Sequence, residues 1–366
     1  MIFVRVVFFL LAIFVESERE ISANSCFSVA DTIQGLNACF EKGFPGDNTL
    51  SDAQWERMLP DEEEMKNYQA LIKTVLRGGR GRFCNNKVLA LYPSISNYID
   101  LQHFQGHFCV IYERNVDPET GYFLRSWGYV VVADDVWSRR DLHHSAPHFQ
   151  SDGNVLNESA AIFERTQSRT LVMAGASRYA VKGSKSTCQS EYSATDCAHN
   201  NNTMFHAVNA AIFEYQANCN HKSCAFIQWH GMAETTCPIC SAFVSAGVSN
   251  HTAIYEDSRI PAVKLAAAFD GIEGVGRACT PLESACKLVA STNVFGRLVN
   301  GVAREDVCTR RSVGASGAFV HVEQRRAARD QWDRWARAIK SAFPVRPSHV
   351  PRPAERRHLS APSNRP

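Results

Sequence analysis

The chain has 366 residues, 45% of them apolar, and its 39 Lys and Arg residues nearly balance its 37 Asp and Glu residues, for a formal net charge of +2 at pH 7. The apolar fraction is ordinary for a chain with a packed core. A net charge so close to zero argues against a nucleic-acid partner. The length fits one large globular domain or two small ones.

The N-terminus predicts export. Residues 1–14 hold one arginine followed by an almost unbroken apolar run, and acidic residues begin at Glu16. The run is shorter than the ~20 apolar residues of a membrane-spanning helix and has the layout of a signal peptide. We assign residues 1–23 to a signal peptide, with cleavage at Ala23 or Ser17. An uncleaved anchor is the alternative. No second apolar span follows, so we expect a secreted protein without membrane contact.

The cysteine content agrees with export. All 13 cysteines follow the apolar run, and in an oxidising compartment most should be paired. Because the number is odd, at least one stays free or pairs between chains. Cys237-Pro-Ile-Cys240 has zinc or redox spacing, but no second such pair exists, and disulfides are the expected state. Glycosylation triplets begin at Asn157, Asn201 and Asn250 and predict a glycoprotein.

Residues 24–136 are expected to form an N-terminal segment of helices followed by strands. Ser51 has the sequence context of a helix start, and residues 62–76 have helical periodicity. Strand patterns follow at residues 87–92, 108–114 and 122–133.

From residue 137 to residue 343 strands alternate with helices. We expect buried strands at residues 170–175, 224–231 and 317–324, and helices between and after them. This alternation predicts an α/β fold, a three-layer αβα sandwich with a mixed or mostly parallel sheet. In such sheets the ligand lies beyond the carboxyl ends of the strands. Residues 344–366 are rich in proline and are expected to be a disordered tail.

A histidine-rich segment lies between two predicted strands. Residues 141–152 include His143, His144, His148 and Asp152. Imidazole and carboxylate are the usual ligands of a catalytic zinc ion. The spacing His148-x-x-x-Asp152 lets a loop wrap two ligands around one ion. A histidine-rich loop without function is the alternative.

Two candidates for substrate contact follow in the chain. Arg178 comes soon after the strand predicted at residues 170–175, and its planar guanidinium suits a carboxylate. A structural salt bridge is the alternative. His199 and Asp196 precede a predicted helix and are candidates for contacts with the substrate or with a metal ligand.

Two later strands end in candidate catalytic residues. His230 leaves a buried strand directly before Gly231, where an α/β sheet exposes its site. Glu323 ends another buried strand. Burial raises the pKa of a carboxyl group, which suits a general base. Pairing of Glu323 with nearby arginines is the alternative. The chain has no Gly-x-Ser-x-Gly elbow to indicate a serine triad.

The order Pro-His…Asp, Asp-x-x-His, apolar strand-His-Gly and apolar strand-Glu resembles the N-formylglutamate amidohydrolase group of the zinc-carboxypeptidase-like superfamily. The resemblance covers residues 140–342. It implies a zinc ion held by His148, Asp152 and His230, with Glu323 activating water and the segment around Arg178 binding a substrate carboxylate. Secreted fungal proteins without an assigned activity share the segment Asn-Val-Phe-Gly-Arg-Leu, present here at residues 293–298, and are a closer likeness.

Two departures from the family pattern leave the ligand set open. The family's Pro-His-Ser-Gly reads Pro-His-Phe-Gln here, and Asp152 lies one residue further on than the usual acid, which is commonly glutamate. His144 could therefore be the ligand instead. We expect a secreted zinc-dependent hydrolase of an amide bond in a small or peptide-like substrate with a carboxylate. The alternatives are a non-catalytic binding or surface protein on this fold and a metal-dependent phosphoester hydrolase.

Overall fold

The computed structural model describes residues 23–217, 219, 224–248 and 252–346. Almost all of the predicted signal peptide, Asn250 and residues 347–366 therefore lie outside the described residues. A nine-stranded sheet organises the rest, in the order β1-β2-β3-β5-β4-β6-β9-β7-β8. Its strands are β1 (Ile99–Phe104), β2 (Phe108–Glu113), β3 (Tyr129–Ala133), β4 (Asp141–Ala146), β5 (Thr170–Met173), β6 (Cys224–Gly231), β7 (Cys240–Ser245), β8 (Arg277–Cys279) and β9 (Phe319–Gln324).

The sheet is mixed, with a parallel centre. β5, β4, β6 and β9 lie side by side in that order, and each runs parallel to the next. β1, β2 and β3 pair antiparallel, and β3 pairs antiparallel with β5. On the other side β7 runs antiparallel to β9 and parallel to β8. This arrangement confirms the predicted α/β fold class. Because β3 joins β5, residues 24–136 and residues 137–343 contribute to one sheet.

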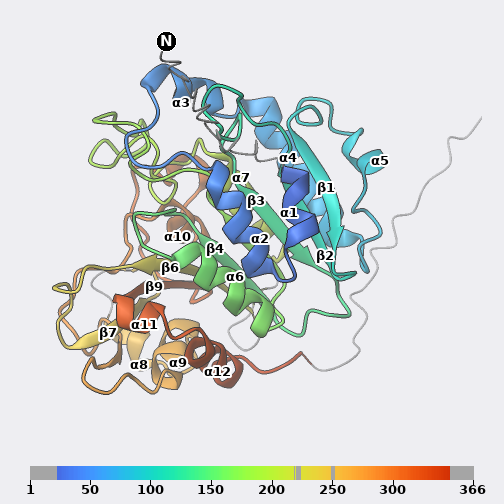
Figure 1. Cartoon of the computed structure of the whole chain (residues 1–366). Coiled ribbons are helices and arrows are strands. Elements are labelled where there is room, and N and C mark those ends of the chain that lie inside the picture. Colours follow the sequence, from blue (N-terminus) through green and yellow to red (C-terminus); the bar gives the residue numbers. More distant parts are fainter. Residues whose placement is uncertain (1–22, 218, 220–223, 249–251, 347–366) are drawn as a thin grey trace, which may run out of the picture.

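Helices cover both faces of the sheet. α1 (Ala23–Val29), α2 (Ile33–Phe40), α6 (Val155–Arg165), α9 (Pro261–Ala268) and α12 (Trp332–Ala342) enclose one hydrophobic core, and Figure 1 shows α1, α2 and α6 across the near face. α4 (Glu62–Arg77), α7 (Met204–Tyr215) and α10 (Val294–Val299) enclose the other. The shorter helices are η1 (Glu41–Gly43), α3 (Asp52–Met58), α5 (Asn86–Leu89), α8 (Thr252–Glu256), η2 (Arg304–Asp306) and α11 (Arg326–Arg329).

Local sequence accounts for most of these elements. Ser51 and Asp61 cap α3 and α4 through reciprocal capping boxes, which confirms the helix start predicted at Ser51 and the helix predicted at residues 62–76. The strand predicted at residues 87–92 is wrong, because Asn85 caps the backbone N–H groups of Lys87 and Val88 and starts α5 instead. β4 was missed as a strand because its sequence, Asp-Leu-His-His-Ser-Ala, is polar. It lies between two parallel strands and is buried on both faces.

Strand alternation separates a dry face from a polar one. On β6, Ala225, Ile227 and Trp229 belong to the core beneath α6 and α12. The intervening residues, Gln228 and His230, therefore face the side of α7 and α10. The same side of β9 carries His321 and Glu323, whereas Gln324 faces the other side and donates to Glu158 of α6.

Disulfides tie the loops around this sheet. The pairs are Cys26–Cys39, Cys84–Cys109, Cys188–Cys308, Cys219–Cys224, Cys237–Cys286 and Cys240–Cys279. Cys237 and Cys240 thus bond elsewhere and not to each other. Cys197 is the free cysteine and is buried. The prediction of disulfide bonding with one unpaired cysteine is confirmed.

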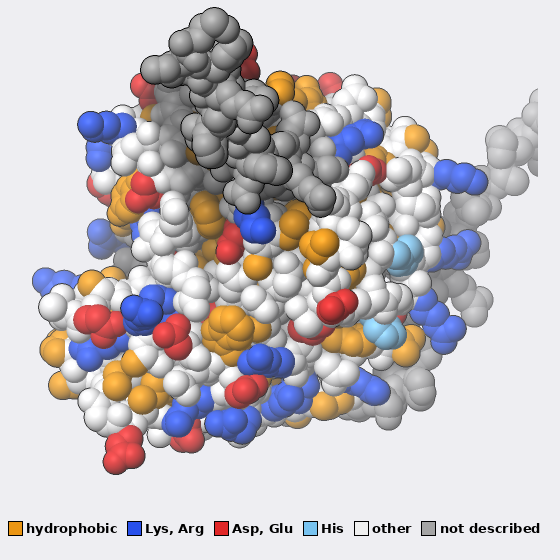
Figure 2. All heavy atoms as spheres, viewed as in Figure 1, with side chains coloured by type: hydrophobic (Ala, Val, Ile, Leu, Met, Phe, Trp, Pro, Cys, Tyr) orange, Lys and Arg blue, Asp and Glu red, His pale blue; other side chains and the backbone are white. Residues whose placement is uncertain are grey.

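Four further observations concern the described residues. Acidic and basic side chains are interspersed on the face shown in Figure 2. Among the described residues no helix is long and apolar enough to cross a membrane. The side-chain amide of Asn157 donates to Glu41, so the atom that glycosylation would modify is engaged. Arg346, in the predicted tail, lies 3.2 Å from the Asp141 carboxylate.

Candidate metal centre

The predicted ligands meet at the carboxyl edge of the parallel strands. His148 follows β4, and His230 lies near the end of β6, in register with Glu323 of β9. Because parallel strands end at the same edge, their terminal side chains converge. His148, Asp152 and His230 form a buried group that could hold a metal ion, with ligand atoms within 4.8 Å of one another.

The spacing within this group suits a small tetrahedral cation. His148 Nδ1 lies 2.9 Å from Asp152 Oδ2 and 3.1 Å from His230 Nδ1. His230 Nδ1 lies 3.4 Å from the same carboxylate oxygen. Zinc–nitrogen and zinc–oxygen bonds of 2.0–2.1 Å at tetrahedral angles place ligand atoms about 3.3 Å apart. The triangle of donor atoms, with sides of 2.9–3.4 Å, is therefore close to the size that a small tetrahedral cation needs.

Outer hydrogen bonds fix which ring nitrogens face the centre. His148 Nε2 donates to Asp196 Oδ1 at 2.9 Å, and His230 Nε2 donates to Gln228 Oε1 at 3.0 Å. In a neutral imidazole the other nitrogen then carries a lone pair. Two Nδ1 lone pairs and the Asp152 carboxylate thus point at one spot. Arg178 Nη1 lies 3.3 Å from His148 Nδ1 and offsets part of this repulsion, and a proton or a metal ion between the three atoms would remove the rest.

A second layer of contacts holds these partners in place. Asp196 accepts hydrogen bonds from Arg178 Nε at 3.0 Å, from Arg178 Nη2, and from the backbone N–H of Ala198 at 3.1 Å. The side-chain amide of Asn293 donates to Gln228 Oε1, the same oxygen that accepts from His230 Nε2. The backbone N–H of Gly231 donates to Asp152 Oδ2 at 3.1 Å. Partners of this kind orient metal ligands and raise their basicity.

Burial and charge act against each other in the centre. Burial and Arg178 lower the pKa of His148, but the carboxylates of Asp152 and Asp196 outweigh them, and the net shift is upward. Burial raises the pKa of both carboxyl groups, but His148 outweighs it and holds each below its ordinary value. Burial lowers the pKa of His230 to about 4. His148 is therefore the group that holds a proton when no ion is bound.

Glu323 lies beside the triangle. Burial, followed by the charge of Asp152, raises the pKa of its carboxyl group to about 8. The alternative that Glu323 pairs with neighbouring arginines is not what the structure has. Arg325 donates instead to the carbonyls of Thr236 and Cys237, and Arg329 donates to the Asn154 side chain.

His321 is a site residue that the sequence prediction missed. It forms a second group with His230 and Glu323 whose ligand atoms also lie within 4.8 Å of one another. Its Nε2 lies 3.6 Å from Glu323 Oε1. The alternation of β9 could have revealed it, because residues two apart on a strand share a face.

The prediction of His144 as an alternative ligand needs correction. His144 lies in β4 on the opposite face of the sheet, stacked on Trp229. Its Nδ1 accepts from the indole N–H of Trp229 at 2.9 Å, and its Nε2 lies 2.9 Å from Ser168 Oγ. Burial lowers its pKa to about 3. Both nitrogens are taken, and His144 belongs to neither group that could hold a metal.

Arg178 and His199 lie near the centre with other partners. Arg178 Nε and Nη2 donate to Asp196, which is the salt-bridge alternative. Its Nη1 lies 3.3 Å from His148 Nδ1 and 3.8 Å from Asp152 Oδ1. His199 stacks on Tyr192, with ring centroids 3.4 Å apart, and its Nδ1 is hydrogen-bonded to Gln189. His199 is in neither group that could hold a metal.

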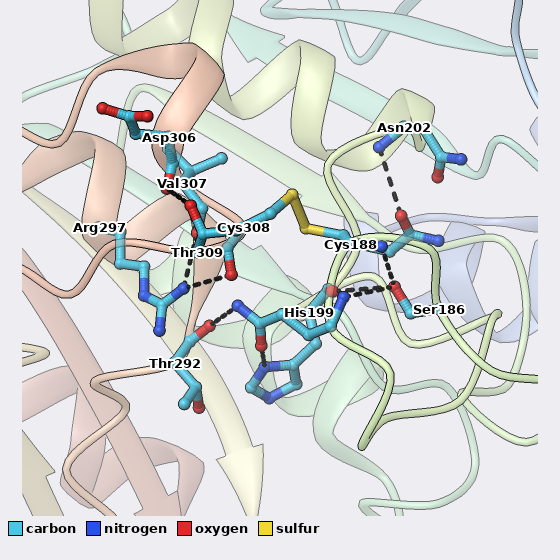
Figure 3. Close-up of a disulfide and its surroundings, with 12 residues drawn as sticks. Ser186, Cys188, His199, Asn202, Thr292, Arg297, Asp306, Val307, Cys308 and Thr309 are labelled. Carbon is cyan, nitrogen blue, oxygen red and sulfur yellow. Dashed lines mark hydrogen bonds between the residues drawn. A yellow bond between two sulfur atoms is a disulfide. The ribbon is translucent and has the colours of Figure 1, made fainter.

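A disulfide braces the loop that carries these contacts. Figure 3 shows Cys188 joined to Cys308 beside His199, whose backbone carbonyl accepts from Ser186 Oγ. In the same region Arg297 donates to the Cys308 carbonyl. The pairing spans 120 residues of sequence and ties the loop before α7 to the loop after α10.

A cavity opens beside the centre. Its volume is about 410 Å³, and its wall includes Arg178 and Asp196 together with Tyr179, Lys185 and Tyr192. Arg178 and Asp196 also contact His148, so these two residues lie between the cavity and the triangle of donor atoms, whose own residues are not part of the cavity wall. Its size and mixed polar wall suit a small polar molecule.

Comparison with known proteins adds no relative. No protein-family model matches the chain, and no match was found among the curated proteins or the solved structures. The chemistry of the centre therefore rests on its own residues.

Proposed function

We propose that the protein is a secreted, zinc-dependent hydrolase that cleaves an amide bond in a carboxylate-bearing substrate. One observation carries the proposal. The Nδ1 atoms of His148 and His230 and the Asp152 carboxylate converge within 2.9–3.4 Å, with each Nε2–H held outward by Asp196 or Gln228. Three protein ligands of this type leave a fourth position open, as catalytic zinc sites do.

The neighbouring residues support a hydrolytic role. A bound zinc ion would polarise the scissile carbonyl and the attacking water. Glu323 stands beside His230, and its pKa of about 8 lies close enough to neutral pH for its ionised form to take a proton from water and for its protonated form to return it to the leaving nitrogen. Arg178 and Lys185 offer cationic contacts for a substrate carboxylate, in a cavity wall that also carries Asp47, Glu191 and Asp196.

Two features support secretion. Six disulfides occur in the described residues, and such a density is typical of oxidising compartments. The apolar N-terminal run supplies the expected export signal.

Metal content and substrate range test the proposal together. Mature protein from a secreting host should contain one zinc per chain, lose it to a strong chelator, and regain it on titration. The zinc-loaded protein should release amino acids from N-formyl and N-acetyl amino acids, and the chelated protein should not. Cleavage of a phosphomonoester with no amide cleavage would favour the phosphoester hydrolase. A parent protein that binds no zinc would favour the binding protein.

A further inference from the structure

His321 is a buried histidine with an unexplained nitrogen. The residue is 5% exposed, and among the described residues its Nδ1 has no hydrogen-bond partner. Its ring lies 4.3 Å from the ring of His230, and its Nε2 lies 3.6 Å from Glu323 Oε1. Buried polar atoms without partners are rare and mark either a missing water or a functional constraint.

Ser245 offers the missing partner. It lies directly opposite His321 in the antiparallel pair of β7 and β9. Ser245 is fully buried, and its hydroxyl also lacks a partner among the described residues. Opposite residues share a face, with Cβ atoms about 4.5–5.5 Å apart. The serine hydroxyl can therefore serve His321 Nδ1 directly or through one water.

We infer that His321 is a positioning residue for Glu323. In this arrangement the Ser245 hydroxyl would donate to His321 Nδ1 directly or through one water, which would leave the proton on Nε2 and direct Nε2–H at Glu323 Oε1. None of the described residues donates another hydrogen bond to that carboxylate, so this contact sets its orientation. A separation of 3.6 Å is long for a hydrogen bond, and contacts of this kind tighten when the substrate binds. The inference rests on the proposed function, which makes Glu323 the base.

A second metal ion in the group of His230, His321 and Glu323 is the rival explanation. His230 would have to serve both groups. Its Nδ1 faces His148 and Asp152, and its Nε2 donates to Gln228. Both nitrogens are engaged, so the second group cannot fill without breaking the Gln228 bond. Positioning of Glu323 needs no such rearrangement.

Two variants of His321 separate positioning from structure. His321→Phe keeps the ring shape and removes the donor, so kcat should fall about 10–100-fold with KM and zinc affinity unchanged, a loss typical of partners of a functional group. His321→Gln places an amide N–H close to the lost Nε2–H and should restore most of kcat. In the Glu323→Gln background His321→Phe should cost nothing further, because the group it positions is gone.

Serine variants test the other end of the contact. Ser245→Ala should lower kcat by less than His321→Phe, again with KM and zinc affinity unchanged. Ser241→Ala is the matched control, since Ser241 is on the same strand, equally buried and likewise without a partner for its hydroxyl among the described residues. It does not pair with His321 and should leave kcat unchanged.

A thermal double-mutant cycle in zinc-free protein tests the contact without turnover. The melting temperature shifts of His321→Phe and Glu323→Gln should be non-additive, because residues in contact couple. Additive shifts would overturn the contact, even if the parent proves to have no activity.

Parent-level kcat in His321→Phe would overturn the positioning role. Zinc lost from His321→Phe would establish the second metal site instead. If the parent protein neither binds zinc nor cleaves amides, the proposed function is wrong, but the contact between His321 and Glu323 is still tested by the thermal cycle.

Discussion

Two buried histidines on nearby strands have opposite roles. His144 of β4 and His230 of β6 are 0% and 3% exposed, and burial lowers the pKa of His144 to about 3 and that of His230 to about 4. His144 has a partner on each nitrogen, one of them the indole N–H of Trp229. His230 Nδ1 instead faces the nitrogen of His148 and the carboxylate of Asp152. Neither burial nor a shifted pKa separates the two residues.

The difference lies in what the lone pairs meet. Around His144 an acceptor meets a donor, so the site is complete as it folds. Around His230 acceptors meet acceptors, so the site needs either a proton, which His148 can hold, or a metal ion. Trp229 and His230 are adjacent in sequence, and strand alternation alone sends one to the dry face and the other to the centre. Substitution of His230 should therefore abolish metal binding, whereas substitution of His144 should leave it unchanged.

The largest effect is expected from His230→Ala. The variant loses one of three ligands, so zinc should fall from one per chain to a trace and amide hydrolysis should become undetectable. His144→Phe, the matched control on the other face, should keep one zinc per chain. Elemental analysis after gel filtration measures both. A His230→Ala protein that retains stoichiometric zinc would contradict the assignment.

Glu323→Gln should keep the zinc and lose the reaction. Gln has the shape of Glu but cannot take a proton, and removal of a general base costs roughly 10²–10⁴-fold in turnover. Steady-state kinetics on an N-acyl amino acid that the parent cleaves, with zinc content measured on the same sample, gives the result. Full turnover with zinc bound would show that another group takes the proton.

Asp196→Asn should weaken zinc binding without abolishing it. The aspartate holds the Nε2–H of His148 and is itself held by Arg178, and loss of such an outer partner costs roughly 10–100-fold in metal affinity. Competition with a chelator of known affinity measures the change. Asp47→Asn is the control, because Asp47 lines the same cavity but bonds to Ser177. Equal losses in the two variants would point to a general charge effect.

The sequence predicted the α/β sheet and most residues of the candidate metal centre, because these residues lie at or near strand ends. His230 and Glu323 end apolar strands, and the carboxyl ends of such strands are where α/β sheets bind ligands. His321 was not predicted because it lies inside β9 and not at the strand end, although alternation places it beside Glu323. Arg178 was expected to meet substrate, whereas much of its guanidinium serves Asp196. Pairing of residues this far apart in sequence leaves no local signal.

The fold shows the same division between local and distant causes. β6 coincides with its predicted range of residues 224–231, because a continuous apolar run is typical of a strand buried on both faces. β4 is buried in the same way but carries two histidines and a serine, so only its neighbours reveal it as a strand. Its misassignment as a loop is also why His144 looked available as a ligand.

The smallest effect is expected from His144→Phe, and it acts on stability alone. The variant leaves the indole N–H of Trp229 and the hydroxyl of Ser168 without their imidazole partner. A buried group left unpaired costs roughly 1–3 kcal/mol, so the melting temperature should fall by several degrees at pH 7.5 while zinc binding persists.

Acidification should reduce the difference in melting temperature between the parent and His144→Phe in zinc-free protein. The pKa of His144 is about 3 in the folded chain against an ordinary value of 6.5, so below pH 6.5 the unfolded chain takes up a proton that the folded chain does not. The parent therefore loses the stability linked to His144 as the pH falls from 6.5 toward 3, whereas a phenylalanine has no proton to gain. The gap in melting temperature between the parent and His144→Phe should shrink from pH 7.5 to pH 4.5. Both proteins keep His230 and His148, so the titration of the centre cancels in the difference. A gap that stays constant with pH would mean that His144 is not held neutral by burial, and the contrast drawn between His144 and the metal centre would lose its electrostatic basis.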